Sequence, residues 1–271
     1  MQVRPDGTTV RPPAVAGLFY PADPARLRAE VSDLLADAAQ AVPAGLRPKA
    51  LIAPHAGYAY SGAVAAAAFA ALGEGAARAV RRVVLIGPSH HAAFRGIAAP
   101  AAEALATPLG RVPVDREALS GLADLRFVGF ADGAHAPEHA LEVELPFLQL
   151  RLRTFEVVPL LVGEAKPQQV AEILRQLWGG PETLIVVSSD LSHFHDYETA
   201  RRRDAATAEA IERGDWARVG PGDACGFLAI AGLLIEAERR GLRARRLALC
   251  NSGDTACPRD RVVGYGAWVF A

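Results

Sequence analysis

The chain has 271 residues, a formal net charge of −1, 51% hydrophobic residues and 22% charged residues. This balance is ordinary for a soluble globular protein, and it excludes the basic surface by which many proteins attract nucleic acid. Residues 1–20 lack a positive segment followed by an apolar one, and no stretch approaches the roughly 18 uninterrupted apolar residues of a membrane span. We therefore expect a cytoplasmic protein with no nucleic-acid or membrane partner.

Strand-like and helix-like segments alternate along the chain. The predicted strands are continuous apolar runs, which are typical of strands covered on both faces. They lie at 49–54, 82–88, 155–163, 183–190, 245–250 and 262–271. The amphipathic segments between them predict helices within 23–42, 61–72, 115–125, 142–153, 166–178, 197–214 and 223–241. The first of these helices begins with Asp23 as its cap and Pro24 at its first helical position.

This alternation predicts the fold class and the domain organisation. We expect a single α/β domain over residues 1–271, with a central, mostly parallel or mixed sheet flanked by helices on both faces. The sequence contains no internal repeat, and no linker rich in Pro, Gly or Ser divides it into halves. The three cysteines, Cys225, Cys250 and Cys257, form no CxxC pair, which excludes a zinc ribbon and a thioredoxin-like motif.

The seven histidines fall in four short clusters, and three of the clusters follow predicted strands. His55 follows the first strand, the pair His90 and His91 follows the second, and His193 and His195 follow the strand at 183–190. Ligands of open α/β sheets bind outside the carboxyl ends of the strands. The three clusters are therefore expected to meet at one edge of the sheet. Neutral imidazoles suit iron, copper, nickel or zinc, which makes a metal site the favoured interpretation.

The residues alone leave the third, anionic ligand open between Asp190, Glu138, Asp254 and a cysteine thiolate. Cys257 lies outside the apolar runs on either side of it, so packing does not readily explain it. Cys225 lies near the start of a predicted helix, a position that lowers the pKa of a thiol. That helix is so apolar that we interpret Cys225 as a packing residue.

Several uncommon motifs occur together and in a recognisable order. They are "AVAGLFYP", "APHAGY", "GPSHH", "EHALEVELPF", "VSSDLSH" and a late "NSGDTAC" followed by "VVGYGA". In this set and order the sequence, over residues 15–271, resembles the Memo-like family. Bacterial and archaeal members of that family are called AmmeMemoRadiSam system protein B, and animal members are called Memo, mediator of ErbB2-driven cell motility.

The resemblance implies a fold similar to class III extradiol dioxygenases, which are non-haem iron(II) enzymes. It implies a pocket lined by two histidines and a cysteine, which by motif are His55, His90 and Cys257. It further implies iron(II) as the metal, with copper or zinc as alternatives. The dioxygenases carry a carboxylate where the cysteine falls, so the resemblance supports metal binding more directly than ring cleavage. His193 matches the acid/base histidine of the dioxygenases, and Asp190 is expected beside it.

Two functions of different classes follow from the resemblance. One is a metal-dependent oxidoreductase that acts on a small aromatic or diol-like molecule. The other is a metal- or peptide-binding adaptor without turnover, on a dioxygenase-like scaffold. The family name also implies an AMMECR1-domain protein and a radical-SAM protein as partners.

Overall fold

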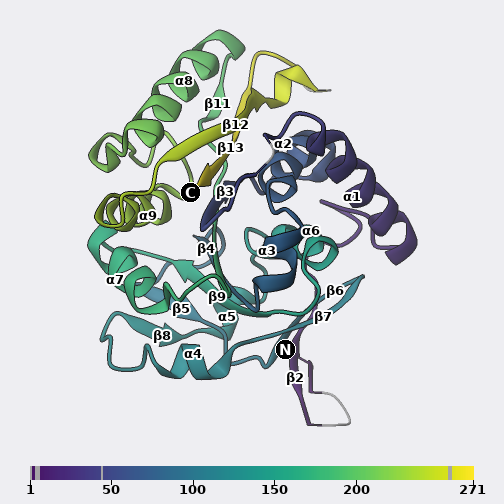
Figure 1. Cartoon of the computed structure of the whole chain (residues 1–271), viewed down its shortest axis with the longest axis vertical. Coiled ribbons are helices and arrows are strands. Elements are labelled where there is room, and N and C mark those ends of the chain that lie inside the picture. The colour runs from purple at the N-terminus through teal and green to yellow at the C-terminus, as the bar shows by residue number, and fades with distance from the viewer. Residues whose placement is uncertain (1, 4–6, 44, 256–257) are drawn as a thin grey trace.

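The structure, a computed structural model, describes residues 2–3, 7–43, 45–255 and 258–271 (Figure 1). Within these ranges the strands form one sheet of nine strands and one of four. Parallel strands make up the centre of the large sheet, in the order β3 (Ala50–Ala53), β10 (Thr183–Ser188), β4 (Arg82–Pro88) and β9 (Glu156–Val162). The predicted single α/β domain is confirmed.

Antiparallel pairings extend the large sheet on both sides and make it mixed. On one side β13 (Val262–Phe270) pairs with β3, and it also pairs with β12 (Ala244–Asn251) and β11 (His193–His195). On the other side β5 (Ile97–Ala99) pairs with β9 and carries β8 (Val128–Phe130). The strands predicted from apolar runs are all present. The three-residue strands β5, β8 and β11 have no such run to predict them, because they are too short to show a pattern.

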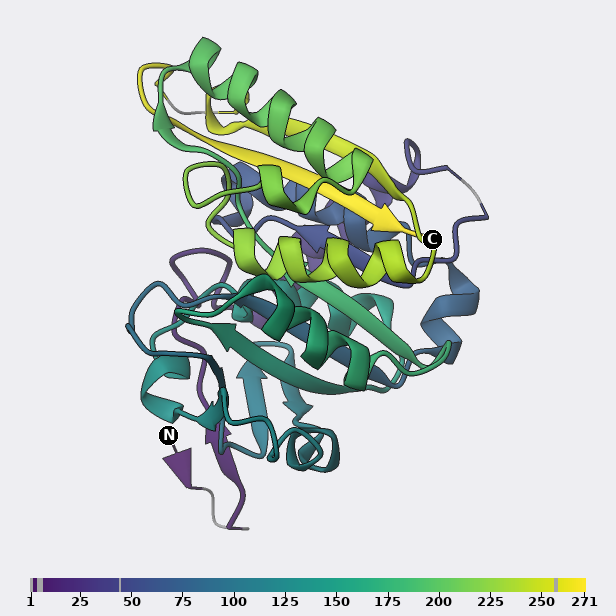
Figure 2. The same cartoon turned by 90° about the vertical axis from the view of Figure 1, so that its left-hand side faces the viewer.

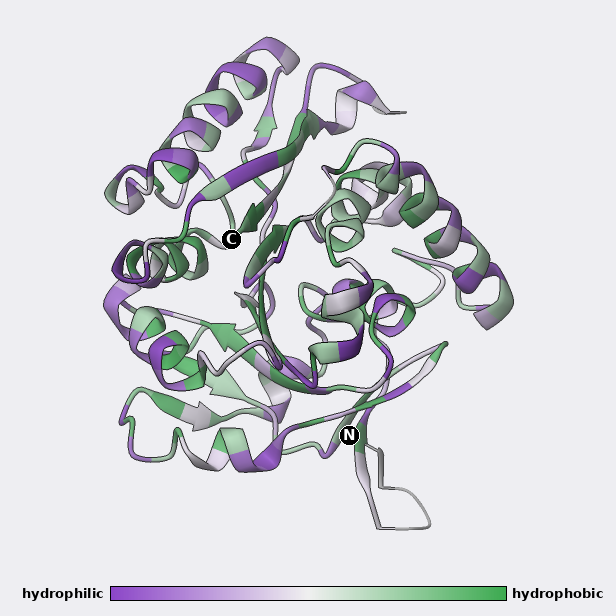
Figure 3. Cartoon of the chain, in the orientation of Figure 1, coloured by the Kyte–Doolittle hydropathy of each residue, from purple (hydrophilic) through white to green (hydrophobic). Residues whose placement is uncertain are grey.

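The central strands are buried on both faces, as their composition predicts. Every residue from Val83 to Ile86 in β4 and from Leu184 to Val187 in β10 is fully buried. The same strands are coloured as hydrophobic in Figure 3, whereas the outer turns of α8 are hydrophilic. Burial of each such side chain stabilises the fold by about 1.5–3 kcal/mol. The sheet therefore forms a rigid platform for the loops at its edges.

Helices cover both faces of the large sheet (Figure 1). One layer contains α1 (Pro24–Ala39), α2 (Tyr58–Ala70), α3 (Glu74–Ala79) and α6 (Leu145–Arg151). The other contains α7 (Pro167–Leu177), α8 (Tyr197–Arg213) and α9 (Phe227–Arg239), which face the viewer in Figure 2. Two short helices, α4 (Arg116–Ser120) and α5 (Asp132–His135), lie near β8 and β5. None of the helices in the described ranges has the length and apolarity that a membrane crossing requires.

The start of α1 follows the capping rule from which it was predicted. The Asp23 side chain accepts a hydrogen bond from the backbone N–H of Arg26, and Pro24 occupies the first helical position. Leu27, Val31 and Leu35, spaced one turn apart, are the buried residues of this helix. The local signals and the buried face therefore agree.

The small sheet contains β1 (Gln2–Val3), β2 (Thr9–Arg11), β6 (Ala104–Thr107) and β7 (Gly110–Pro113). Arg11, at the end of β2, forms a buried ion pair with Glu142. Its guanidinium also donates to the carbonyl oxygens of His135, at 3.0 Å, and Glu138. Removing one partner of a buried pair typically costs about 3–5 kcal/mol, because the other charge is left without compensation. Arg11 thus fastens the small sheet to the segment 135–142.

His135, whose carbonyl oxygen accepts from Arg11, is expected to make the stability of the fold depend on pH. His135 is buried, and its Nε2–H donates to the carbonyl oxygen of Ala98 at 2.9 Å. Burial lowers the pKa of His135 from 6.5 to about 4. Between these two values the unfolded chain binds the extra proton, so stability that is present above pH 6.5 is lost as the pH falls toward 4. The full loss is on the order of 3 kcal/mol for this side chain.

We expect His135→Gln to flatten this dependence, because the amide keeps a donor for Ala98 and does not titrate. The measurement is the midpoint of urea unfolding for both proteins at about pH 7, above the window in which His135 affects stability, and at about pH 5, inside it. Wild type should lose more stability on acidification than the variant. Parallel losses would show that His135 is not the titrating group.

Candidate metal centre

Three neighbouring parallel strands deliver polar side chains to one edge of the sheet. His55 lies two residues after β3, Asp190 two residues after β10, and His90 two residues after β4. The imidazole rings of His55 and His90 have centroids 5.1 Å apart and meet edge to face. The predicted meeting of these segments at the carboxyl edge is therefore confirmed, and it follows from the parallel order of the strands.

The third donor in the described part of the chain is Cys225. Its Sγ lies 3.3 Å from His55 Nε2, and one ligand atom each of His55, His90 and Cys225 lie within 4.8 Å of one another. Cys225 stands just before α9, which packs against β10 and β4, and its backbone N–H donates to the carbonyl oxygen of Asp190. The packing of α9 on the sheet therefore places the thiol at the histidine cluster. This position differs from the apolar packing role that the sequence favours for Cys225.

His55 is held as a neutral imidazole. It is 1% exposed, and burial lowers its pKa well below the usual value. Its Nδ1 lies 2.7 Å from the hydroxyl oxygen of Ser188, and its backbone N–H donates to Asp190 Oδ1 at 2.9 Å. One ring nitrogen, Nδ1, is thus hydrogen-bonded to Ser188, and the other, Nε2, faces Cys225. A neutral imidazole is the form that binds a metal.

His90 is oriented by the buried carboxylate of Glu138. The backbone N–H of His90 donates to Oε2 at 2.6 Å, and its ring Nδ1 lies 2.9 Å from Oε1. Burial alone would raise the pKa of Glu138, but hydrogen bonds from His90 and from the backbone N–H of Ala140 lower it to about 2. Glu138 is therefore an ionised acceptor, so His90 donates through Nδ1 and keeps the Nε2 lone pair free. Carboxylate–histidine pairs of this kind orient ligands in many metal sites.

A second cluster, formed by His90, Glu138 and His139, also has ligand atoms within 4.8 Å of one another. The His139 ring stacks on His90 with centroids 4.7 Å apart and contacts Phe19, and burial lowers its pKa to about 4. Glu138, however, already accepts from the ring and backbone of His90 and from the backbone N–H groups of His139 and Ala140. We therefore interpret His139 and Glu138 as the wall of the site, and His55, His90 and Cys225 as its donors.

The two residues predicted to be catalytic lie beside this donor group. Asp190 is buried, and burial raises its pKa to about 7 although it accepts a hydrogen bond from His55. His193 donates from Nδ1 to the carbonyl oxygen of Leu191 at 2.8 Å, which leaves its Nε2 lone pair free. Burial lowers the pKa of His193, although the hydrogen bond to Leu191 acts in the opposite direction. Their catalytic roles stay predictions.

The backbone next to His193 is strained. Phe194 has φ = 64°, the left-handed region that non-glycine residues rarely adopt, and the register of β11 against β13 shifts between His193 and His195. Its side chain is exposed, and the guanidinium of Arg261 lies over the ring at 4.4 Å. Such strain costs about 1–3 kcal/mol and concentrates at functional sites. The strained residue therefore directly follows His193, the predicted acid/base residue.

Asp254 and Cys257, the candidate ligands between β12 and β13, are not part of the donor group in the described residues. Cys257 lies outside the described residues, so its assignment as a metal ligand stays a prediction. Asp254 accepts from the hydroxyl of Tyr197 at 2.5 Å and from the backbone N–H of Asn251 at 3.0 Å, at the 3₁₀ turn Ser252–Asp254. These bonds commit Asp254 to the local turn. Cys250 is half-buried on β12, and burial raises its pKa to about 11.

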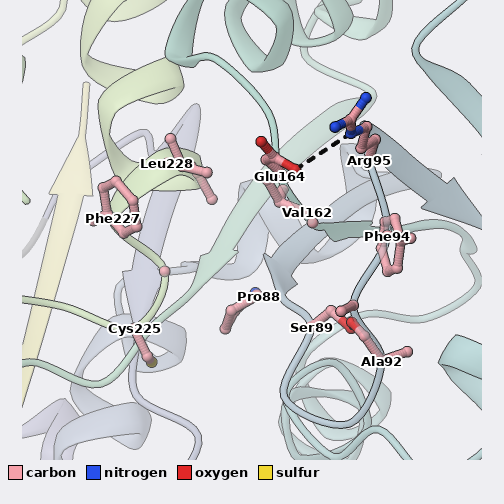
Figure 4. A pocket seen from close by; sticks show the side chains of 14 residues that line it. Pro88, Ser89, Ala92, Phe94, Arg95, Val162, Glu164, Cys225, Phe227 and Leu228 are labelled. Atoms are coloured by element: carbon pink, nitrogen blue, oxygen red, sulfur yellow. Dashed lines mark hydrogen bonds and ion pairs between the residues drawn. The ribbon is translucent and has the colours of Figure 1, made fainter. Parts of the chain in front are cut away.

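A pocket of about 470 Å³ borders the donor group, with Cys225 in its wall (Figure 4). It lies between the loop after β4, the end of β9 and the start of α9. Arg95 and Glu164 form an exposed ion pair across one side of it. The other lining residues are mainly apolar, and they include Pro88, Ala92, Phe94, Val162, Phe227 and Leu228. The volume suits a small organic molecule.

Comparison with known proteins gives a consistent relationship over nearly the full length. The family "Memo-like protein" matches residues 11–269. The chain is similar to a "MEMO1 family protein" of Sulfolobus acidocaldarius, with 32% identity over 94% of this chain and 97% of the relative. It is also similar to proteins of that name from Aquifex aeolicus, with 32% identity, and Ignicoccus hospitalis, with 34%; each alignment covers 96% of this chain and at least 98% of the relative. The chain therefore belongs to the Memo-like (MEMO1) family.

Proposed function

We propose that this protein binds a transition-metal ion through His55 Nε2, His90 Nε2 and Cys225 Sγ. The observation that carries the proposal is the convergence of three donors from distant segments to within 4.8 Å of one another. Each imidazole has its Nδ1 engaged by the protein, by Ser188 in one case and Glu138 in the other. Metal-ligating histidines almost always make this second bond.

The donor chemistry supports a first-row transition metal. Two imidazoles and one sulfur suit iron, copper or zinc, whereas Mg²⁺ and Ca²⁺ prefer oxygen ligands. We propose iron(II), on the strength of the family resemblance, with copper and zinc as the competing metals. Burial raises the pKa of the Cys225 thiol to about 12. Binding therefore releases a proton, because the ligand form of cysteine is the thiolate.

We further propose that the site is that of an oxidoreductase for a small aromatic or diol-like molecule. Three protein ligands leave coordination positions open, at which a bound redox metal supplies Lewis acidity and electron transfer. The pocket beside Cys225 offers apolar walls for the body of such a molecule. His193, with a free Nε2 and a lowered pKa, is suited to take a proton from a substrate hydroxyl and return it. Asp190 holds the backbone of His55 in place.

One observation favours a second candidate, a metal-binding protein without turnover. The third donor here is the thiol of Cys225, so the site departs from the two-histidine, one-carboxylate pattern of non-haem iron(II) oxygenases. A thiolate is a softer ligand and favours tight retention of copper or zinc. In this alternative the pocket beside Cys225 holds a small molecule or a peptide side chain that is not converted.

The ligand set is tested by metal content after anaerobic purification and loading with iron(II), copper or zinc. Wild type should hold one ion per chain, and His55→Ala, His90→Ala and Cys225→Ser should each lose affinity by more than the roughly 100-fold that outer-shell changes cost. Cys250→Ser is the matched control, since it changes a half-buried thiol on β12 and should keep the ion. Cys257→Ser tests the set predicted from the motif. Metal loss in Cys257→Ser with retention in Cys225→Ser would reverse our assignment.

The role of His193 is tested by separating metal content from turnover. His193→Ala should retain the ion, and it should lower oxygen uptake with a catechol by about 100-fold or more, the usual contribution of a general base. His195→Ala, two residues along the same strand, should change neither. Equal metal loss in His193→Ala and His55→Ala would contradict this division of roles. No oxygen uptake by iron-loaded wild type with any catechol would leave the binding protein as the better candidate.

A further inference from the structure

A buried glutamate lies behind His55, on the side away from Cys225. Glu144 is fully buried in the 3₁₀ turn Glu142–Glu144, which leads into α6. Its Oε1 lies 2.8 Å from the hydroxyl oxygen of Ser188, and within the described ranges its Oε2 has no hydrogen-bond partner. No cation of the described residues forms an ion pair with it, so a carboxylate here would carry an uncompensated buried charge, which is highly unfavourable.

The hydroxyl of Ser188 is the centre of three contacts. Its oxygen lies 2.6 Å from the carbonyl oxygen of Ala140, 2.7 Å from His55 Nδ1 and 2.8 Å from Glu144 Oε1. A serine hydroxyl has one hydrogen to donate and two lone pairs that accept. The carbonyl of Ala140 can only accept, so it takes the single hydrogen. The other two partners must then both donate to Ser188.

We propose that Glu144 is a neutral carboxylic acid that donates its proton to Ser188, and that this hydrogen-bond order fixes His55 as the Nδ1–H tautomer. Glu144 is thus a positioning residue that acts on His55 through Ser188. The Nδ1–H tautomer directs the lone pair of His55 Nε2 toward Cys225, 3.3 Å away. In the other tautomer a hydrogen would occupy that direction.

In any other hydrogen-bond order, the close contact between Ser188 and the carbonyl oxygen of Ala140 would contain no hydrogen. If Glu144 were ionised and accepted the hydrogen of Ser188, two oxygens would face each other at 2.6 Å between Ser188 and Ala140. If Ser188 donated to His55 instead, the same contact would be left unpaired. Burial also raises the pKa of Glu144 well above its usual value; the contact with Ser188 lowers it in part, and the nearby carboxyl group of Asp190 raises it further. The same use of a neutral buried acid as a donor is known from other enzyme sites.

The protonation of Glu144 is tested on the metal-free protein by infrared spectroscopy. The spectrum of wild type minus that of Glu144→Gln at neutral pH should contain the C=O stretch of a protonated carboxyl group. The Gln side chain keeps a donor for Ser188, so the fold and the tautomer should be preserved. A difference spectrum with carboxylate bands instead would overturn the proposal.

The tautomer is tested separately by ¹⁵N NMR of histidine-labelled protein, with His55→Gln to assign the signal. Wild type and Glu144→Gln should show His55 protonated on Nδ1, and Ser188→Ala should lose this preference. Ser192→Ala, which changes another buried serine whose backbone N–H bonds to Asp204, should behave as wild type. An Nε2–H signal in wild type would overturn the proposal even if a variant failed to fold.

The consequence for metal binding rests on the proposed function, and zinc is the probe. Ser188→Ala should weaken zinc binding by about 10–100-fold, as outer-shell changes commonly do, and Glu144→Gln should bind like wild type. Glu144→Leu, which removes the donor, should weaken it as Ser188→Ala does. If wild type bound no zinc but showed the protonated carboxyl and the Nδ1–H signal, the proposed function would fail and this inference would stand. Normal zinc binding without those two signals would overturn this inference and leave the proposed function standing.

Discussion

The rest of the site depends on the hydrogen bonds that the buried carboxylate of Glu138 accepts from His90. Glu138 is 2% exposed and accepts four hydrogen bonds, two of them from the backbone and ring of His90. Without this acceptor the loop after β4 would lose the group that fixes both its backbone and its imidazole. Removing this acceptor also leaves the buried N–H group of Ala140 unpaired, at a cost of roughly 1–3 kcal/mol.

Glu138 belongs to a short segment that contains three buried glutamates with three different partners. Glu138 orients His90, Glu142 pairs with Arg11 and accepts from the backbone that leads to α1, and Glu144 contacts Ser188 behind His55. Glutamates are almost never fully buried unless their carboxyl groups have partners, and each of these three has one. This segment contacts the chain between β2 and α1, the loop after β4 and the end of β10. These contacts hold the donor group in place.

Much of this arrangement could be predicted from the sequence, because it depends on local patterns. The apolar runs predicted the central strands, and histidines placed directly after them predicted a common edge. The third donor could not be predicted in this way. The place of Cys225 depends on how α9 packs across the sheet, which no local pattern records, and its apolar surroundings in the sequence are equally typical of a packing residue. The burial of Glu144 could not be predicted for the same reason, since nothing near it in the sequence distinguishes it from a surface glutamate.

The central claim is that a metal ion at this edge is bound by one sulfur and two imidazole nitrogens. X-ray absorption at the zinc edge of the zinc-loaded protein measures this directly. We predict one sulfur neighbour at about 2.3 Å and nitrogen neighbours at about 2.0–2.1 Å, with the sulfur lost in Cys225→Ser. A shell of nitrogen and oxygen alone in wild type, or a sulfur that persists in Cys225→Ser, would contradict the account.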